Sequence, residues 1–217
     1  FAAQGLSGIT PEQQRMALIV WFFSLAFPDL MPTKPILMVE GVKGAGKRSI
    51  VVMMQLALTG RKKPMMLKKN GEDDFAVILL RSPIALFDNT DSYIDWVPDA
   101  IANYCTGGVV DKRRLYTDDE SITIRPHAFI AIATRNPASF RRDDVADRCV
   151  ILRLDRRPAF KAAEAIELEI AAQRSKLVGE YMWYVGKLVE SIREAHAANE
   201  QQDETHRMAD FASFARH

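Results

Sequence analysis

Hydrophobic residues in this chain gather in short runs, which are separated by longer segments with a helical pattern. The runs predicted to be buried strands are 36–39, 65–67, 84–87, 128–133 and 149–154. Short apolar runs of this kind are typical of strands that are covered on both faces. Because such strands alternate here with helices, we expect an α/β fold in which helices cover both faces of a parallel sheet.

The intervening segments carry signals for the beginnings and ends of helices. A typical N-cap at Thr10, followed by proline and glutamate, begins a helix predicted over 11–26. Gly60 is expected to end the helix that follows a glycine-rich loop, and further helices are predicted over 73–80 and 94–104.

A β-hairpin is predicted where two β-rich segments, 113–117 and 121–124, flank an acidic turn. From residue 158 onward the pattern is helical, with a break near 197–203. We therefore divide the chain into a core over 1–157 and a small helical lid over 158–217.

Composition narrows the class of protein further. Hydrophobic residues make up 48% of the 217 positions, which is too many for a disordered segment. Lys and Arg number 29 against 28 Asp and Glu, so the net charge of +1 predicts neither a nucleic-acid nor an acidic partner. Any such partner must be bound by a local cluster of charge.

Cysteine usage and the apolar runs exclude several other classes. The two cysteines, Cys105 and Cys149, lack the spacing of a zinc module or a disulfide scaffold and fit a reducing cytoplasm. The longest apolar run, 16–27, is shorter than the roughly 20 residues that cross a bilayer, so we expect no membrane segment. The chain starts at Phe1 without a charged leader, and we expect it to be part of a longer protein.

A glycine-rich loop lies directly after the first predicted strand and opens a helix. Its sequence is Gly41-Val42-Lys43-Gly44-Ala45-Gly46-Lys47. Glycines allow the backbone N–H groups to turn inward around an anion, and the helix N-terminus adds its positive dipole. Lys47 would reach the β- and γ-phosphates of a nucleotide. The alternative, a chance glycine turn beside a solvated lysine, is much weaker because strand and helix both lie in the expected places.

One position departs from the usual phosphate loop. Arg48 stands where a serine or threonine hydroxyl would ligate Mg²⁺, and a hydroxyl comes one residue later, at Ser49. One residue turns a helical side chain by about 100°, so Ser49 does not simply replace the missing ligand. Arg48 would contact phosphates, contact a neighbouring subunit, or weaken metal binding.

A second candidate element is the apolar run 84–87, which ends in an aspartate. Open α/β sheets bind ligands at the carboxyl ends of their strands, and Asp88 would hold Mg²⁺ there through water. Asn89 follows, where a glutamate often polarises the attacking water; an asparagine orients a water but does not accept its proton. The alternative is that Asp88 only caps a turn.

A third strand, 128–133, leads into Thr134, Arg135 and Asn136. Asn136 would hydrogen-bond the attacking water or the γ-phosphate. An asparagine before proline is by itself usually a turn residue, but here it follows the two elements above in the expected order.

The three elements together resemble AAA+ P-loop ATPases, and among them the branch of superfamily 3 and minichromosome-maintenance helicases. The ATPase modules of phage and plasmid replication proteins are the most similar. The likeness spans roughly 14–214 and also rests on 35–37, 106–108, 114–118, Asp147-Arg148 and 207–211.

The resemblance implies roles for several further residues. Asn136 matches the first sensor residue, and Arg207 matches the second sensor in the lid. Arg148 matches the arginine finger that reaches into a neighbour's site, with Arg141 and Arg142 as competing candidates. Such fingers accelerate phosphoryl transfer by about 10³–10⁵-fold in well-studied cases.

The predicted hairpin matches the pre-sensor hairpin of ring helicases. Lys112, Arg113 and Arg114 at its base would contact DNA, although the acidic tip over 118–120 is a departure from a DNA-binding hairpin. Two other basic clusters, 61–63 and 68–69, are more commonly solvated surface than phosphate contacts.

By this resemblance the chain binds ATP and Mg²⁺ between subunits of a homo-oligomeric ring, expected to be a hexamer, and couples hydrolysis to movement on single-stranded DNA. Primase or DNA-binding regions would belong to the same full-length protein. Two alternatives stay open: an assembly or loading switch with weak hydrolysis, and a DNA-binding module with a degenerate nucleotide site.

Overall fold

The computed structural model describes residues 9–113, 121–137, 140, 142–156, 159, 161–198 and 208–217. Its helices are α1 (Pro11–Ser24), α2 (Lys47–Thr59), α3 (Glu72–Arg81), α4 (Val97–Cys105), α5 (Asp143–Ala146), α6 (Ala163–Ala197) and α7 (Ala209–Phe214). Its strands are β1 (Ile36–Gly41), β2 (Pro64–Met65), β3 (Ile84–Asp88), β4 (Val110–Arg113), β5 (Ser121–Ile124), β6 (Phe129–Thr134) and β7 (Cys149–Leu154).

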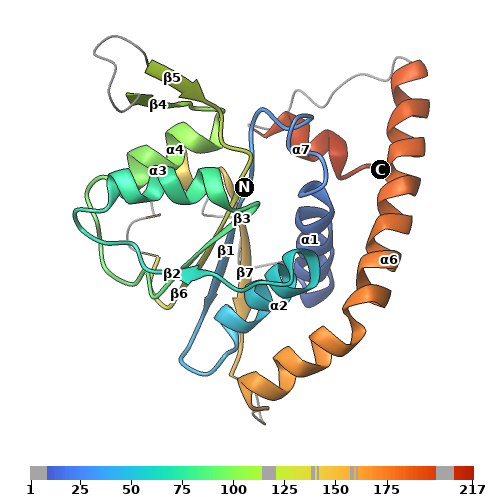
Figure 1. Ribbon diagram of the computed structural model, residues 1–217, viewed down its shortest axis with the longest axis horizontal. Coiled ribbons are helices and arrows are strands. Elements are labelled where there is room, and N and C mark those ends of the chain that lie inside the picture. The colour runs from blue at the N-terminus through green and yellow to red at the C-terminus, as the bar shows by residue number, and fades with distance from the viewer. Residues whose placement is uncertain are drawn as a thin grey trace.

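Five strands form a parallel sheet in the order β2-β3-β6-β1-β7. The strand next to β1 on one side is therefore β6, a late strand in the chain, and not β3. Helices α3 and α4 lie on one side of the sheet, and α1, α2, α6 and α7 lie on the other (Figure 1). This is the α/β three-layer arrangement of a P-loop NTPase, as expected.

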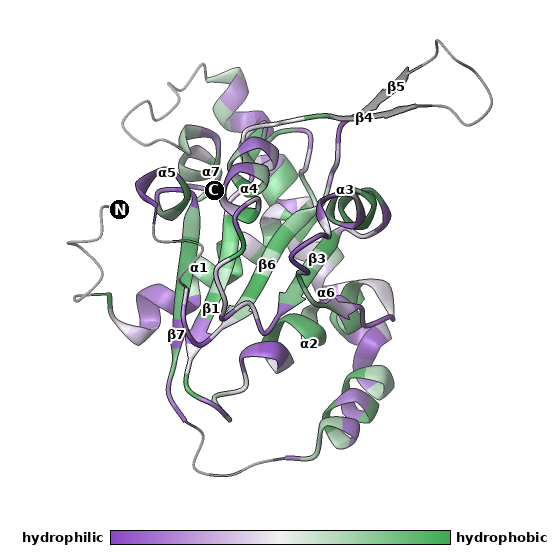
Figure 2. Ribbon diagram, turned by 90° about the vertical axis from the view of Figure 1, so that its left-hand side faces the viewer, coloured by the Kyte–Doolittle hydropathy of each residue, from purple (hydrophilic) through white to green (hydrophobic). Residues whose placement is uncertain are grey.

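Alternating side chains of the central strands fill two separate cores. Ile36 and Met38 of β1 pack in the core with α3 and α4, whereas Leu37 and Val39 pack in the core with α1 and α2. The hydrophobic residues therefore concentrate in the central strands (Figure 2). Burial on both faces explains why the strands appear as continuous apolar runs in the sequence.

Local signals fix the ends of the helices around the site. Thr10 forms a capping box with Gln13 and begins α1 as predicted. Gly60, with φ of 68°, closes α2 in the left-handed conformation. The side chain of Arg174 on α6 donates to the carbonyls of Leu56 and Leu58, so α6 also satisfies the free end of α2.

The C-terminal helices pack against the same layer as α1 and α2. Tyr181 of α6 stacks on Phe23 of α1 at a centroid distance of 5.1 Å, and Phe214 of α7 contacts Phe27 at 5.4 Å. Within the described residues, no helix combines the length and the apolarity that a bilayer crossing requires.

The predicted hairpin is present in its described part. β4 begins earlier than the predicted first strand, is described as far as Arg113, and pairs antiparallel with β5 in the register Arg113↔Ser121. Of the predicted strand over 113–117, Arg113 alone is described, and it belongs to β4. Residues 114–120, including Arg114 and the acidic tip, lie outside the described residues.

Candidate nucleotide-binding site

The candidate site lies where the carboxyl ends of β1, β3 and β6 meet. Glu40 of β1 is in register with Thr134 of β6, and Asp88 of β3 is in register with Ala133. The phosphate loop, the end of β3 and the residues after β6 thus come to one edge of the sheet, as parallel strands require.

The loop has the backbone of an anion cradle. Gly44 and Gly46 have φ of 84° and 85°, in the left-handed region that side chains disfavour. A Cβ on Gly41 would lie 2.4 Å from the carbonyl oxygen of Leu154 in β7, so no other residue fits there. Gly46 makes no side-chain cap, which leaves the first N–H groups of α2 facing the loop.

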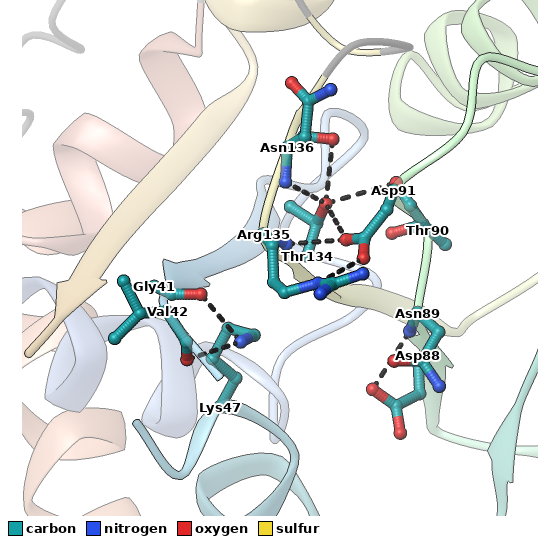
Figure 3. Close-up of polar contacts among 10 residues, drawn as sticks. All are labelled: Gly41, Val42, Lys47, Asp88, Asn89, Thr90, Asp91, Thr134, Arg135 and Asn136. Atoms are coloured by element: carbon teal, nitrogen blue, oxygen red, sulfur yellow. Dashed lines mark hydrogen bonds and ion pairs between the residues drawn. The ribbon is translucent and has the colours of Figure 1, made fainter. Parts of the chain in front are cut away.

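Lys47 folds back over the loop that it ends. Its Nζ donates to the carbonyl oxygens of Gly41 at 2.7 Å and Val42 at 3.0 Å (Figure 3). Burial lowers the pKa of Lys47, and the nearby Arg135 acts in the same direction. The ammonium is held at the mouth of the cradle, where an incoming phosphate would exchange with the two carbonyls.

Arg48 pairs with the aspartate at the end of β3. Its Nη1 lies 3.6 Å from Asp88 Oδ2, and Asp88 Oδ1 accepts the N–H of Asn89 at 3.0 Å. The Arg48 side chain is 56% exposed and the Asp88 side chain 16%. The carboxylate that would hold Mg²⁺ therefore already has a cation beside it, and the predicted Mg²⁺ site does not fit this arrangement of side chains.

Asn89 has an unusual backbone. Its φ of 56° places it in the left-handed region, the only such non-glycine among the described residues. Asparagine tolerates this conformation better than most residues. The chain therefore turns sharply directly after Asp88.

A second carboxylate, Asp91, joins the ends of β3 and β6. Asp91 Oδ1 accepts the Arg135 backbone N–H at 2.7 Å and the Thr134 hydroxyl at 3.1 Å, and Oδ2 accepts Arg135 Nε at 2.6 Å (Figure 3). Burial alone would raise the pKa of Asp91, but these hydrogen bonds outweigh it and lower the pKa. Neither Asp91 nor Arg135 was predicted as a site residue, because nothing in their spacing marks them as a pair.

Hydrogen bonds to the Thr134 hydroxyl hold the backbone of Asn136. Its N–H donates to the Thr134 hydroxyl oxygen at 3.1 Å, and its carbonyl oxygen, 2.9 Å away, is an alternative to Asp91 Oδ1 as acceptor of the single hydroxyl proton. Its side-chain amide is directed away from Lys47 (Figure 3). The first-sensor role stays a prediction that requires this amide to turn toward a nucleotide. Thr90 also lies here, and its buried hydroxyl has no hydrogen-bond partner within the described part of the chain.

Arg148 lies at the opposite edge of the sheet. Its carbonyl accepts the N–H of Ile36, the first residue of β1, whereas the phosphate loop begins at the last. The length of β1 separates the two by about 17 Å at ~3.3 Å per residue. The Arg148 guanidinium donates to the carbonyl of Asp144. It is therefore distant from the loop of its own chain.

The other basic residues predicted to have a role are described only in part. Arg142 is engaged by Asp99 at 2.6 Å and Asp144 at 2.9 Å. Arg141 and Arg207 lie outside the described residues. Lys112 lies on β4, in register with Ile122 of β5.

Comparison with known proteins identifies a family whose model matches this chain. The model of the family described as "Actinomycete integrative conjugative element replication protein" matches residues 5–217. No curated protein matches the chain. Among solved structures, a crystal structure of JCV helicase with a bound small-molecule acetamide is similar at a TM-score of 0.46 and 14% identity. The match covers 83% of this chain and 63% of the JCV helicase chain, so this chain spans less than two thirds of that structure.

Proposed function

The chain belongs to the family of actinomycete integrative conjugative element replication proteins, and from that premise we propose that it is the ATP-binding and ATP-hydrolysing motor of a DNA replication protein. The observation that carries the proposal is the loop Gly41–Lys47. Its glycines adopt the φ angles of an anion cradle at the carboxyl edge of the sheet, with the Lys47 ammonium at its mouth.

The residues around the loop have distinct parts in this proposal. Lys47 and the N–H groups of α2 bind the phosphates, and Arg48 adds a second cation beside them. Asn89 and Asn136 orient the attacking water. Charge that develops on the transferred group is stabilised by donors fixed before the reaction, and this stabilisation usually supplies most of the rate enhancement in such catalysis.

The position of Arg148 supports a mechanism in which the subunits must assemble. Because it lies at the edge opposite its own phosphate loop, it completes a site only in a neighbouring subunit. We propose a homo-oligomeric ring, with a hexamer as the expected size. The Lys112–Arg113 end of β4 would face DNA, expected to be single-stranded. Primase or DNA-binding regions would lie elsewhere in the full-length protein.

A second candidate function is favoured by one observation, the Arg48–Asp88 pair. A carboxylate neutralised by arginine is a poor ligand for the metal that speeds phosphoryl transfer. The chain would then be a switch that assembles or loads on DNA when ATP is bound and hydrolyses it slowly.

Steady-state ATP hydrolysis distinguishes the two candidates. We expect turnover in the wild type to rise with single-stranded DNA and with protein concentration, and Lys47→Ala to remove it. Turnover at the level of Lys47→Ala, but with intact ATP binding, would support the switch. Absence of both turnover and binding would refute the proposed nucleotide site.

A further inference from the structure

We infer that the Arg48 guanidinium supplies the positive charge that phosphate loops ordinarily take from Mg²⁺, so that this chain binds nucleotide polyphosphates without a divalent cation. The inference rests on the proposed function, because it concerns the same loop. It adds that the loop accepts the nucleotide without a bound divalent cation.

The first support is the position of Arg48. It is the second residue of α2, directly after Lys47, where a hydroxyl would otherwise ligate the metal. Its guanidinium lies 3.6 Å from Asp88, the carboxylate that would hold the metal's water. The side chain therefore lies between the two groups from which a Mg²⁺ site is built.

The second support is the state of the carboxylates at this edge of the sheet. Asp88 receives the Arg48 guanidinium on one oxygen and the Asn89 N–H on the other. Asp91 receives Arg135 through both oxygens. Mg²⁺ is usually held by one or two carboxylates together with phosphates and water. Here each of these two carboxylates already has an arginine, and the described residues contain no group of three or more His, Cys, Asp or Glu side chains that could hold a metal ion.

The third support is the chemistry of the guanidinium. It stays charged at any physiological pH, and its planar fork of donors matches two phosphate oxygens at once. Mg²⁺ entering at Asp88 would lie next to this permanent cation and be repelled by it. Because the Arg48 side chain is 56% exposed, its guanidinium can accept a phosphate on its open side while Asp88 continues to position it.

Calorimetric titration of ATP into the full chain, once with excess MgCl₂ and once with excess EDTA, tests the inference. For the wild type we expect the two Kd values to agree within about twofold. For Arg48→Ser, which restores the usual hydroxyl, we expect Kd to be about tenfold weaker in EDTA than in MgCl₂. Arg48→Lys keeps the charge without the fork and should lie between them.

Some results would overturn this inference alone, and others would overturn the proposed function as well. A wild-type Kd that weakens tenfold or more in EDTA, or equal ratios for wild type and Arg48→Ser, would overturn the inference while leaving the nucleotide site intact. Wild-type binding that Lys47→Ala does not reduce, or no binding in either buffer, would overturn the proposed function and this inference together. Because Arg48 is exposed, its variants should fold, and far-UV circular dichroism checks that they do.

Discussion

At the scale of single residues, the site is defined by pairs that the sequence does not reveal. Lys47, Asp88 and Asn136 were predicted from their places after apolar runs, because such runs mark strands and strand ends carry ligands. The contacts Arg48–Asp88 and Arg135–Asp91 were not predicted. They join residues that lie on, or shortly after, different elements, and only the sheet order brings these together.

Asp91 is expected to stabilise the edge of the sheet through its charge. Asp91→Asn keeps the shape but weakens charge-assisted hydrogen bonds from Arg135, so we expect a loss of about 1–2 kcal/mol in the free energy of unfolding at pH 7. Urea denaturation of both proteins measures it, and an unchanged midpoint would contradict the assigned role.

The same pair predicts a pH dependence. The folded pKa of Asp91 is lowered, so its stabilisation is complete above the unfolded value of about 3.9 and is lost as the pH falls through the lower folded value. The difference between wild type and Asp91→Asn should therefore shrink below about pH 4. A difference that stays constant over that range would show that the charge of Asp91 is not its source.

The two thiols are expected to be inert in the folded protein. Burial raises the pKa of Cys105 to about 12 and also raises that of Cys149, which donates to the carbonyl of Val145. At pH 8 almost no thiolate forms, so iodoacetamide should modify neither thiol until urea unfolds the chain. Mass spectrometry counts the adducts; rapid native modification of either thiol would contradict this packing.

At the scale of elements, the central strands β1, β3 and β6 were predicted well because they are buried on both faces and bounded by turn residues. The start of the first hairpin strand at Val110 was not predicted, since residues 110–112 carry no strong strand pattern in the sequence. The packing of α6 on α1 and α2 was not predicted either. Tyr181 makes the contact with α1 and Arg174 the contact with α2, and the partners of both lie far away in the chain.

Replacing a glycine by alanine should change the free energy of unfolding in opposite directions at Gly41 and at Gly186. In Gly41→Ala the new Cβ would lie 2.4 Å from the backbone oxygen of Leu154, so we expect a loss of more than about 2 kcal/mol. Gly186 in α6 has open space around its Cα, and Gly186→Ala should gain about 0.5–1 kcal/mol from helix propensity. Thermal unfolding of both variants compares them; similar shifts would contradict the loop geometry.

At the scale of the whole molecule, the sheet places the two groups that the proposed hydrolysis needs at opposite edges. The phosphate loop lies at the carboxyl edge, and Arg148 lies at the other, beside the start of β1. A site built from both is complete only between two copies of the chain. We therefore expect hydrolysis per subunit to rise with protein concentration.

Mixing variants tests this division between subunits. Arg148→Ala and Lys47→Ala should each abolish turnover, by about 10³-fold or more for a lost finger. Mixed together, they should recover part of it, because an Arg148→Ala subunit keeps an intact loop that a Lys47→Ala neighbour can complete. Arg142→Ala serves as the matched control, since Asp99 and Asp144 already engage that side chain. Full activity of Arg148→Ala alone would refute the assignment.

The central claim is that nucleotide phosphates bind in the loop Gly41–Lys47, and hydrogen–deuterium exchange with and without saturating ATP tests it most directly. We predict that ATP slows exchange of the amides over residues 41–50, and that Lys47→Ala abolishes this protection. ATP-dependent protection elsewhere in the chain, with the loop unchanged, would contradict the claim.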